Sequence, residues 1–173
     1  MLNQDIVFRD TYRLLCIFMA EQAIFDITPE DQQVWGGSQS SEEPLFRLRH
    51  QFIEDEINHT LINLAICNRT HMEFKKEKHA REYPDHICGT LIRGVATGED
   101  EPLTFREACN KIIHANTFLA TFKIAEEVKN VTDEVAPIHH EIWLLGDKFG
   151  KKWKAELDVL GFLRATTENF DLF

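Results

Sequence analysis

The chain has 173 residues, a length that suits one domain with its own hydrophobic core and leaves little room for two. Hydrophobic residues make up 43% and charged residues 28%, as in ordinary globular proteins, and no apolar run approaches the roughly 20 residues that a membrane-spanning helix needs. A formal net charge of −10 argues against a surface that coats nucleic acid, because phosphate binding requires an excess of Lys and Arg, and it favours a partner that is itself basic.

Helical spacing of apolar residues predicts two long helices in the first half of the chain. The first covers about residues 5–27, where apolar side chains recur at intervals of three and four. Residues 28–44 contain Pro29, a pair of glycines and a serine-rich run, which predicts a loop. The second helix covers about residues 45–76 and is predicted to be the longest in the fold.

A shorter helix is predicted over residues 84–92, followed by a loop with glycines and acidic residues over 94–102. The clearest helix start comes next, where Thr104 and Glu107 have the spacing of a capping box, with Thr104 as N-cap and Glu107 reaching back to its amide. This helix runs to about His114. Its apolar stripe is predicted to comprise Phe105, Ala108, Cys109, Ile112 and Ile113.

Beyond His114 the spacing of apolar residues changes to partial alternation, which predicts strands. Residues 141–159 have the pattern of a hairpin with a glycine-bounded loop, and residues 161–169 are expected to form a last short helix. The predicted fold is therefore mostly α, a bundle of four to five helices with a small C-terminal β-hairpin or meander. It forms a single domain over 1–173, helical over about 1–115, with the hairpin and last helix over about 116–173.

Cysteine usage and the first residues indicate the compartment. The four cysteines lie far apart, with no Cys-x-x-Cys pair and no histidine at zinc-ligand spacing. Free thiols, no metal site and a reducing environment are therefore expected. Charged residues within positions 1–10 do not suit a signal peptide, so the sequence predicts a cytoplasmic protein.

Other candidate sites are weak. Glu56 and His59 have the Glu-x-x-His spacing of a di-metal bundle site, but that site needs a second such pair, which the sequence lacks. Gly146 and Gly150 bracket a loop that ends in Lys151, yet a phosphate-binding loop needs a wider glycine spacing and a Ser or Thr after the lysine. No cofactor is expected.

Two basic features near the end of the chain are interpreted as surface residues. The adjacent His139 and His140 point to different faces of a strand and do not suit one metal ion. The lysines at 151, 152 and 154 interleave with Trp153, which could grip phosphate and stack on a base. Lysines on the solvent face of a hairpin are the favoured interpretation.

One helix carries a recognisable spacing of polar residues. Asn110 and His114 lie one turn apart, with Arg106 one turn earlier on the same side. The polar residue, three spacers and a His resemble the HEPN superfamily, small helical bundles often encoded in bacterial toxin, antitoxin and defence loci. Ribonuclease members have an Arg directly before the polar residue, where this chain has Cys109. The resemblance implies a dimer in which His acts on the 2′-hydroxyl and Arg on phosphate, and Arg106 is the candidate replacement.

Three functional hypotheses follow. The favoured one is a non-catalytic, acidic, HEPN-like binding protein that neutralises a basic protein such as a nuclease toxin, in an immunity or antitoxin pairing. The second is a metal-independent ribonuclease acting as a homodimer, with His114 as general base, Asn110 beside it and Arg106 as phosphate stabiliser. The third is a structural helical protein without activity. The predicted partner-binding acids are Glu54, Asp55, Glu56, Glu99, Asp100 and Glu101.

Overall fold

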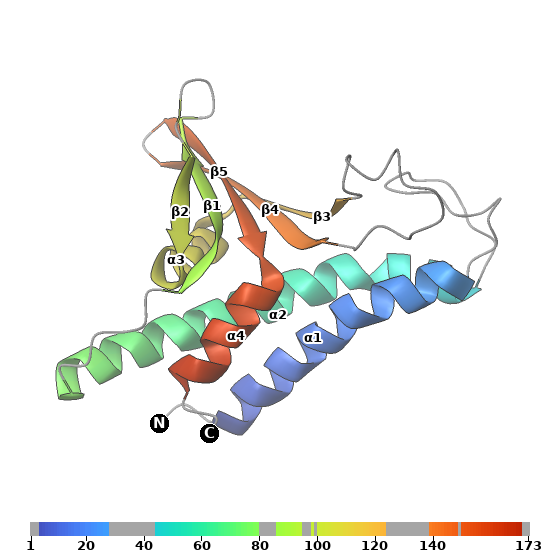
Figure 1. Ribbon diagram of the computed structural model, residues 1–173, viewed down its shortest axis with the longest axis horizontal. Coiled ribbons are helices and arrows are strands. Elements are labelled where there is room, and N and C mark those ends of the chain that lie inside the picture. The colour runs from blue at the N-terminus through green and yellow to red at the C-terminus, as the bar shows by residue number, and fades with distance from the viewer. Residues whose placement is uncertain are drawn as a thin grey trace, which may run out of the picture.

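The computed structural model describes residues 4–27, 44–79, 86–94, 98, 100–123, 139–148 and 150–170. These residues form helices and strands in mixed order along the chain (Figure 1). The elements are α1 (Gln4–Ile27), α2 (Pro44–His79), β1 (Ile87–Arg93), β2 (Asp100–Thr104), α3 (Phe105–His114), β3 (Thr117–Lys123), β4 (His139–Lys148), β5 (Lys151–Asp158) and α4 (Val159–Asn169).

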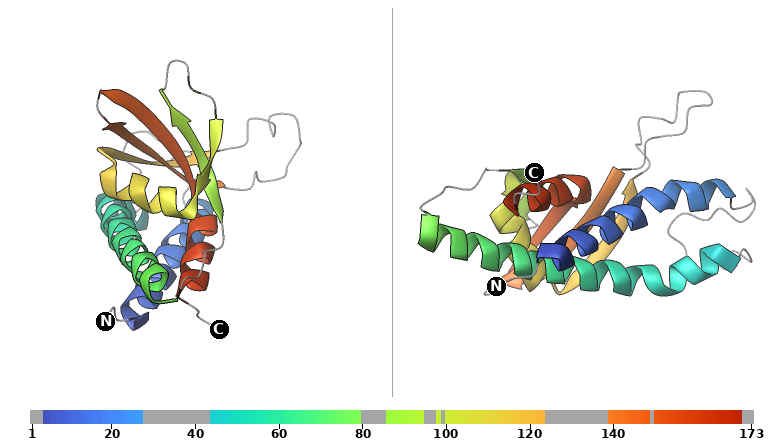
Figure 2. Two further views of the ribbon diagram at one scale, coloured as in Figure 1. Left: turned by 90° about the vertical axis from the view of Figure 1, so that its left-hand side faces the viewer. Right: turned by 90° about the horizontal axis from the view of Figure 1, so that it is seen from below.

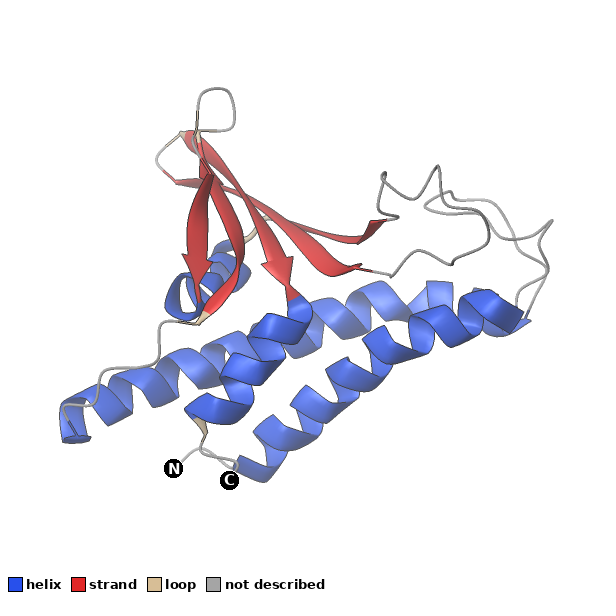
Figure 3. Cartoon of the chain, viewed as in Figure 1, coloured by secondary structure: helices blue, strands red, loops and turns tan. Residues whose placement is uncertain are grey.

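A five-stranded sheet dominates the second half of the chain, so the predicted helical bundle is wrong and the fold is α+β (Figure 3). The strand order is β2-β1-β5-β4-β3, and each neighbouring pair is antiparallel. The predicted hairpin is confirmed as β4 and β5, but it forms the centre of a larger sheet. A hairpin alone would have left its apolar face partly exposed, and three further strands extend that face into one side of a core.

The strand β1 replaces the helix predicted over 84–92, of which residues 84 and 85 lie outside the described residues. Three β-branched side chains and Gly89 within six residues favour an extended backbone over a helix. Pairing with β5 then favours the strand over the helix, because Leu91 lies opposite Ala155 and both are buried. Burial against the neighbouring strand outweighs the ambiguous local pattern.

The strand β2 replaces part of the loop predicted over 94–102. It contains Pro102, which has no amide hydrogen to donate to a neighbouring strand. Because β2 is the edge of the sheet, a missing donor on its free side leaves no ladder bond unmade. The acidic pair Asp100 and Glu101, interpreted as loop residues, instead lies on this edge strand.

The long helices, the capped helix and the last helix are confirmed. The predicted ranges 5–27, 45–76 and 161–169 correspond to α1, α2 and α4. In α3 the predicted apolar stripe is buried at Phe105, Ala108, Cys109 and Ile112. Among the helices of the described ranges, none combines the length and apolar character that crossing a bilayer would require.

The helices cover one face of the sheet in successive layers (Figure 2). Helix α3 and helix α4 pack directly against strands, and α1 and α2 run antiparallel to each other on the far side of them (Figures 1 and 2). Alternate residues of β5, Trp153, Ala155 and Leu157, are buried in the resulting core.

A buried polar junction fixes α4 against α2. The Asn68 amide donates to Thr166 Oγ1 at 3.0 Å, and the Asn169 amide donates to Asn68 Oδ1 at 2.9 Å. All three residues are buried, where a hydrogen bond costs more to lose than at the surface. Gln4 Nε2 also donates to the Phe170 carbonyl at 3.5 Å, so the described chain begins and ends side by side.

Candidate functional site

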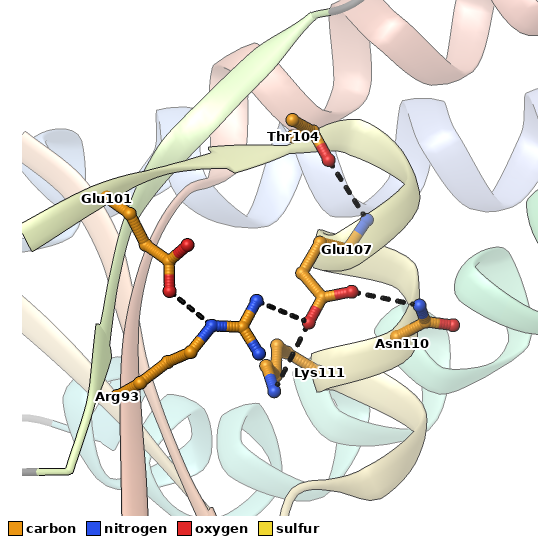
Figure 4. A network of polar contacts seen from close by, with 6 residues as sticks. All are labelled: Arg93, Glu101, Thr104, Glu107, Asn110 and Lys111. Carbon is orange, nitrogen blue, oxygen red and sulfur yellow. Dashed lines mark hydrogen bonds and ion pairs between the residues drawn. The ribbon is translucent and has the colours of Figure 1, made fainter.

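The capped end of α3 carries a network of polar contacts (Figure 4). Thr104 is the N-cap, and its hydroxyl accepts from the Glu107 amide at 3.4 Å. The carboxylate of Glu107 does not make the predicted return contact with the Thr104 amide. Its oxygens accept instead from Asn110 Nδ2 at 3.1 Å, from Lys111 Nζ at 3.3 Å and from Arg93 Nη2 at 3.4 Å.

Glu107 therefore acts as the hub of three donors. Burial disfavours the charged carboxylate, but the hydrogen bond from Asn110 and the positive charges of Lys111 and Arg93 outweigh it and hold the pKa of Glu107 below its ordinary value. The carboxylate is accordingly ionised at neutral pH. It neutralises the positive charges of Lys111 and Arg93.

Lys111 is the most buried cation of this network. Its side chain is only 8% exposed, and its ammonium lies 4.3 Å from the centre of the Trp153 ring. An anion on one side and an aromatic face on the other replace the water that the ammonium has lost. Arg93 closes the network at the surface, where it also pairs with Glu101 of β2. Among the described residues this network connects α3 to β1, β2 and β5 and so stabilises the fold.

Sequence reasoning identified Glu107 and Asn110 but missed Arg93 and Lys111. The spacing of Glu107 and Lys111, four residues apart on one helix, was an available signal for their ion pair. Nothing in the sequence indicated Arg93, because it reaches α3 only through the pairing of β1 with the rest of the sheet.

The residues proposed as catalytic lie along one side of α3, as their spacing predicts. Arg106 and His114 are exposed, and Asn110 between them is half-buried. The amide of Asn110 is already committed to Glu107, whereas its Oδ1 is buried without a hydrogen-bond partner among the described residues. Burial raises the pKa of Cys109, so the thiol at the position of the missing arginine is neutral and inert.

The acidic cluster on α2 is only partly free of intramolecular pairing. Glu54 and Asp55 are exposed. Glu56, in contrast, accepts from Arg13 Nε at 2.7 Å and from the Thr60 hydroxyl at 3.2 Å, which ties α1 to α2. Two of the three predicted partner-binding acids on this helix therefore remain exposed.

The second acidic cluster lies on a different element and does not merge with the first. Asp100 is exposed on β2, Glu101 pairs with Arg93, and Glu99 lies outside the described residues. Strand β2 and the first turns of α2 lie at opposite sides of the molecule (Figure 1). The structure thus does not bring the two predicted clusters together.

The remaining candidates lie apart from this network. The ring of His140, interpreted as a surface residue, is half-buried and packs edge-on against Phe18 of α1 at 5.6 Å between ring centres. His59 accepts a contact from Asn63 at 3.3 Å on the exposed side of α2. Within the ranges that are described, no three His, Cys, Asp or Glu side chains gather as a metal site would require. Lys154 lies 3.6 Å from the Trp143 ring and pairs with Glu156 at 2.8 Å, so this lysine is neutralised within the sheet.

The acidity of the chain is unevenly distributed. Of the 29 Asp and Glu residues, 17 lie at described positions, together with 17 of the 19 Lys and Arg residues. The described part is therefore neutral, and the remaining 12 acidic and 2 basic residues account for the net charge of −10. Most of this excess is in residues 28–43, which hold four acids and no Lys or Arg, and residues 124–138, which hold four acids and one lysine.

These two acidic segments join the fold on the same side. Helix α1 ends and α2 begins on the right-hand side of Figure 1, where β3 ends and β4 begins. The turn between β4 and β5 lies on the other side, with exposed Lys148, Lys151 and Lys152.

Comparison with known proteins adds no relative. No model of a protein family, no curated protein and no solved structure matches the chain.

Proposed function

We propose that the chain is a non-catalytic binding protein that engages a basic protein partner on the side of the molecule where residues 28–43 and 124–138 join the fold. The observation that supports this best is the partition of charge, because the described part is neutral while these two segments carry eight acids against one lysine. Excess charge of one sign steers a complementary partner and raises its association rate.

Exposed acids on the described surface extend the same charge. Glu54 and Asp55 lie in the first half of α2, which begins on that side. The exposed lysines of the β4–β5 turn lie on the other side, so a basic partner is attracted to one side and repelled by the other. Inhibition of a basic nuclease toxin, the pairing expected from the HEPN resemblance, is one form that such binding takes.

The proposal is tested by removing two negative charges either from one of the acidic segments or from elsewhere on the molecule. A fluorescently labelled small cationic ribonuclease serves as the probe, and its affinity is measured at low salt. The variant Glu126→Gln with Glu127→Gln removes two charges from the segment, and Asp100→Asn with Asp147→Asn removes two elsewhere. We expect about tenfold weaker binding for the first pair and little change for the second. Equal losses, or no binding by the unaltered chain, contradict the proposal.

A ribonuclease is the second candidate, supported by Arg106 and His114, which are both exposed on the side of α3 that holds Asn110. Two copies of this side would be needed to form a cleft, with His114 as general base and Arg106 as phosphate stabiliser. This candidate predicts cleavage of RNA in the presence of a chelator, with a cyclic phosphate product, and loss of cleavage in His114→Ala. If RNA stays intact with the unaltered protein and with His114→Ala, the ribonuclease candidate is excluded for that RNA substrate.

A further inference from the structure

One face of the sheet is open. The described helices lie on the side to which Trp153, Ala155 and Leu157 of β5 point, and no described element lies over the opposite side (Figures 1 and 2). Because side chains alternate along a strand, Lys154 and Glu156 point to that opposite side. We call this side of the sheet the open face.

A tryptophan lies on the open face. Trp143 of β4 is paired with Glu156 of β5 and with Leu119 of β3, so all three side chains point to the same side of the sheet. Trp143 is half-buried, and Leu119 is 41% exposed. Trp153, which interleaves with lysines in the sequence, is only 5% exposed and belongs to the core. The aromatic ring that a ligand would meet on this face is therefore that of Trp143.

Three lysines at the β4–β5 turn have no partner among the described residues. Lys148, Lys151 and Lys152 are all exposed. Lys148 lies directly opposite Lys151, where like charges repel each other. Asp147, the acidic residue of this turn, accepts a hydrogen bond from the Gly150 amide at 3.0 Å and pairs with none of the three lysines. An anionic ligand would relieve this repulsion.

The lysines of the turn continue into the open face. Lys152 and Lys154 are alternate residues of β5 and so point to the same side. The ammonium of Lys154 lies 3.6 Å from the centre of the Trp143 ring and pairs with Glu156 at 2.8 Å. The uncompensated charge therefore lies at the turn, and an aromatic ring follows along the same face.

We infer that the turn and the open face bind single-stranded nucleic acid, with the three lysines on its phosphates and Trp143 against a base. Proteins that bind single strands without sequence preference combine positive charge along the backbone with aromatic side chains under the bases. An open sheet face with aromatic side chains is the binding surface of a common RNA-binding module. An anionic membrane would need only the lysines of the turn, whereas the tryptophan on the adjoining face fits a base.

The acidic segments do not oppose this binding. Residues 124–138 join the fold at His139, at the far end of β4 from Lys148. The ten residues of β4 span about 30 Å, which exceeds the Debye length of about 10 Å at 0.1 M salt. The negative charge of this segment is therefore largely screened at the turn. A basic partner and a nucleic acid would bind at opposite ends of the sheet, so the inference does not rest on the proposed function.

The first test measures binding of a fluorescently labelled oligodeoxythymidylate of about 15 nucleotides by fluorescence anisotropy. This probe lacks the 2′-hydroxyl, so ribonuclease activity would not consume it. We expect binding at low salt, with a slope of about −2 in a plot of log affinity against log salt, as three phosphate contacts require. Lys148→Gln with Lys151→Gln should weaken binding at least about tenfold and bring the slope to about −0.7. Lys76→Gln with Arg164→Gln, at exposed positions of α2 and α4, is the matched control and should change neither the affinity nor the slope.

The second test asks whether the open face takes part in binding. Trp143→Leu should weaken binding about fivefold or more, because a base loses its aromatic partner, and should leave the slope unchanged, because no charge is removed. Circular dichroism checks that this variant is folded. The two charge pairs lie at exposed positions, so their comparison decides the case if Trp143→Leu does not fold.

Three results overturn the inference. They are no binding at the lowest salt, equal losses from the two charge pairs, and full affinity in a folded Trp143→Leu. Binding to phosphatidylserine vesicles without binding to the oligonucleotide also overturns it and assigns the lysines of the turn to a membrane surface.

Discussion

Removing Glu107 should destabilise the protein more than removing Lys111, although the two form one ion pair. In Glu107→Gln the ammonium of Lys111 loses its negative partner, although its side chain is only 8% exposed. Breaking a buried pair costs about 3–5 kcal/mol, and because Glu107 is itself 27% exposed we expect about 2 kcal/mol. In Lys111→Met the apolar side chain still packs on Trp153, and Glu107 retains Arg93 and Asn110, so the expected cost is within about 1 kcal/mol.

Urea denaturation of the two single variants and the double variant measures this asymmetry. The double variant has no unpaired buried charge, so it should recover at least about 1 kcal/mol of the loss seen in Glu107→Gln alone. Equal losses for the two single variants that simply add in the double variant would refute the assignment of Glu107 as the compensating anion.

The same pair predicts a dependence on pH. The pKa of Glu107 is lowered in the folded state, so its contribution to stability is present above the ordinary value of 4.5 and is lost as the pH falls through the folded pKa. The difference in unfolding free energy between the unaltered protein and Glu107→Gln should therefore be full at pH 6 and shrink below about pH 4.5. A difference in unfolding free energy that grows as the pH falls would contradict a lowered pKa of Glu107.

Two further predictions concern backbone and thiols. Gly89 has a φ of 130°, and an added Cβ would lie 1.9 Å from a carbonyl oxygen of β5. Gly89→Ala should therefore lower the free energy of unfolding, measured by urea denaturation, by about 3–5 kcal/mol. Gly150 has a φ of 76° but open space around it, so Gly150→Ala should lower it by only about 1 kcal/mol. Burial raises the pKa of Cys88 to about 12 and also that of Cys109, so in a thiol titration of the native protein at pH 8 both should react only after unfolding, while the exposed Cys16 reacts at once. Prompt reaction of Cys109 would show that the apolar side of α3 is open.

The sequence was sufficient for the elements whose pattern is local. Apolar residues at three- and four-residue spacing define α1 and α2, and the cap at Thr104 marks the start of α3. The β4–β5 hairpin was likewise predictable from alternation around its glycines.

Strands β1 and β2 were missed because β1 depends on a distant partner. Residues 87–93 have no strict alternation, and a bulge between Ile87 and Thr90 shifts the register of β1 on β2. Only the pairing of β1 with β5, some sixty residues away in the chain, makes the extended form favourable. The same pairing brings Arg93 to Glu107, which is why the polar network on α3 could not be predicted in full.

The pairing of the acidic residues could not be predicted from the sequence. The predicted clusters on α2 and β2 are partly neutralised by Arg13 and Arg93. Neutralisation follows from contacts between elements, which a count of charged residues does not reveal.

The proposed function is tested most directly by the affinity of the unaltered chain for the labelled cationic ribonuclease as salt is raised from about 50 to 500 mM. Binding steered by the acidic segments should weaken by at least about tenfold over this range, because exposed charges are screened beyond a Debye length of about 10 Å at 0.1 M salt. Affinity that stays constant across the range, or no binding at the lowest salt, would contradict it.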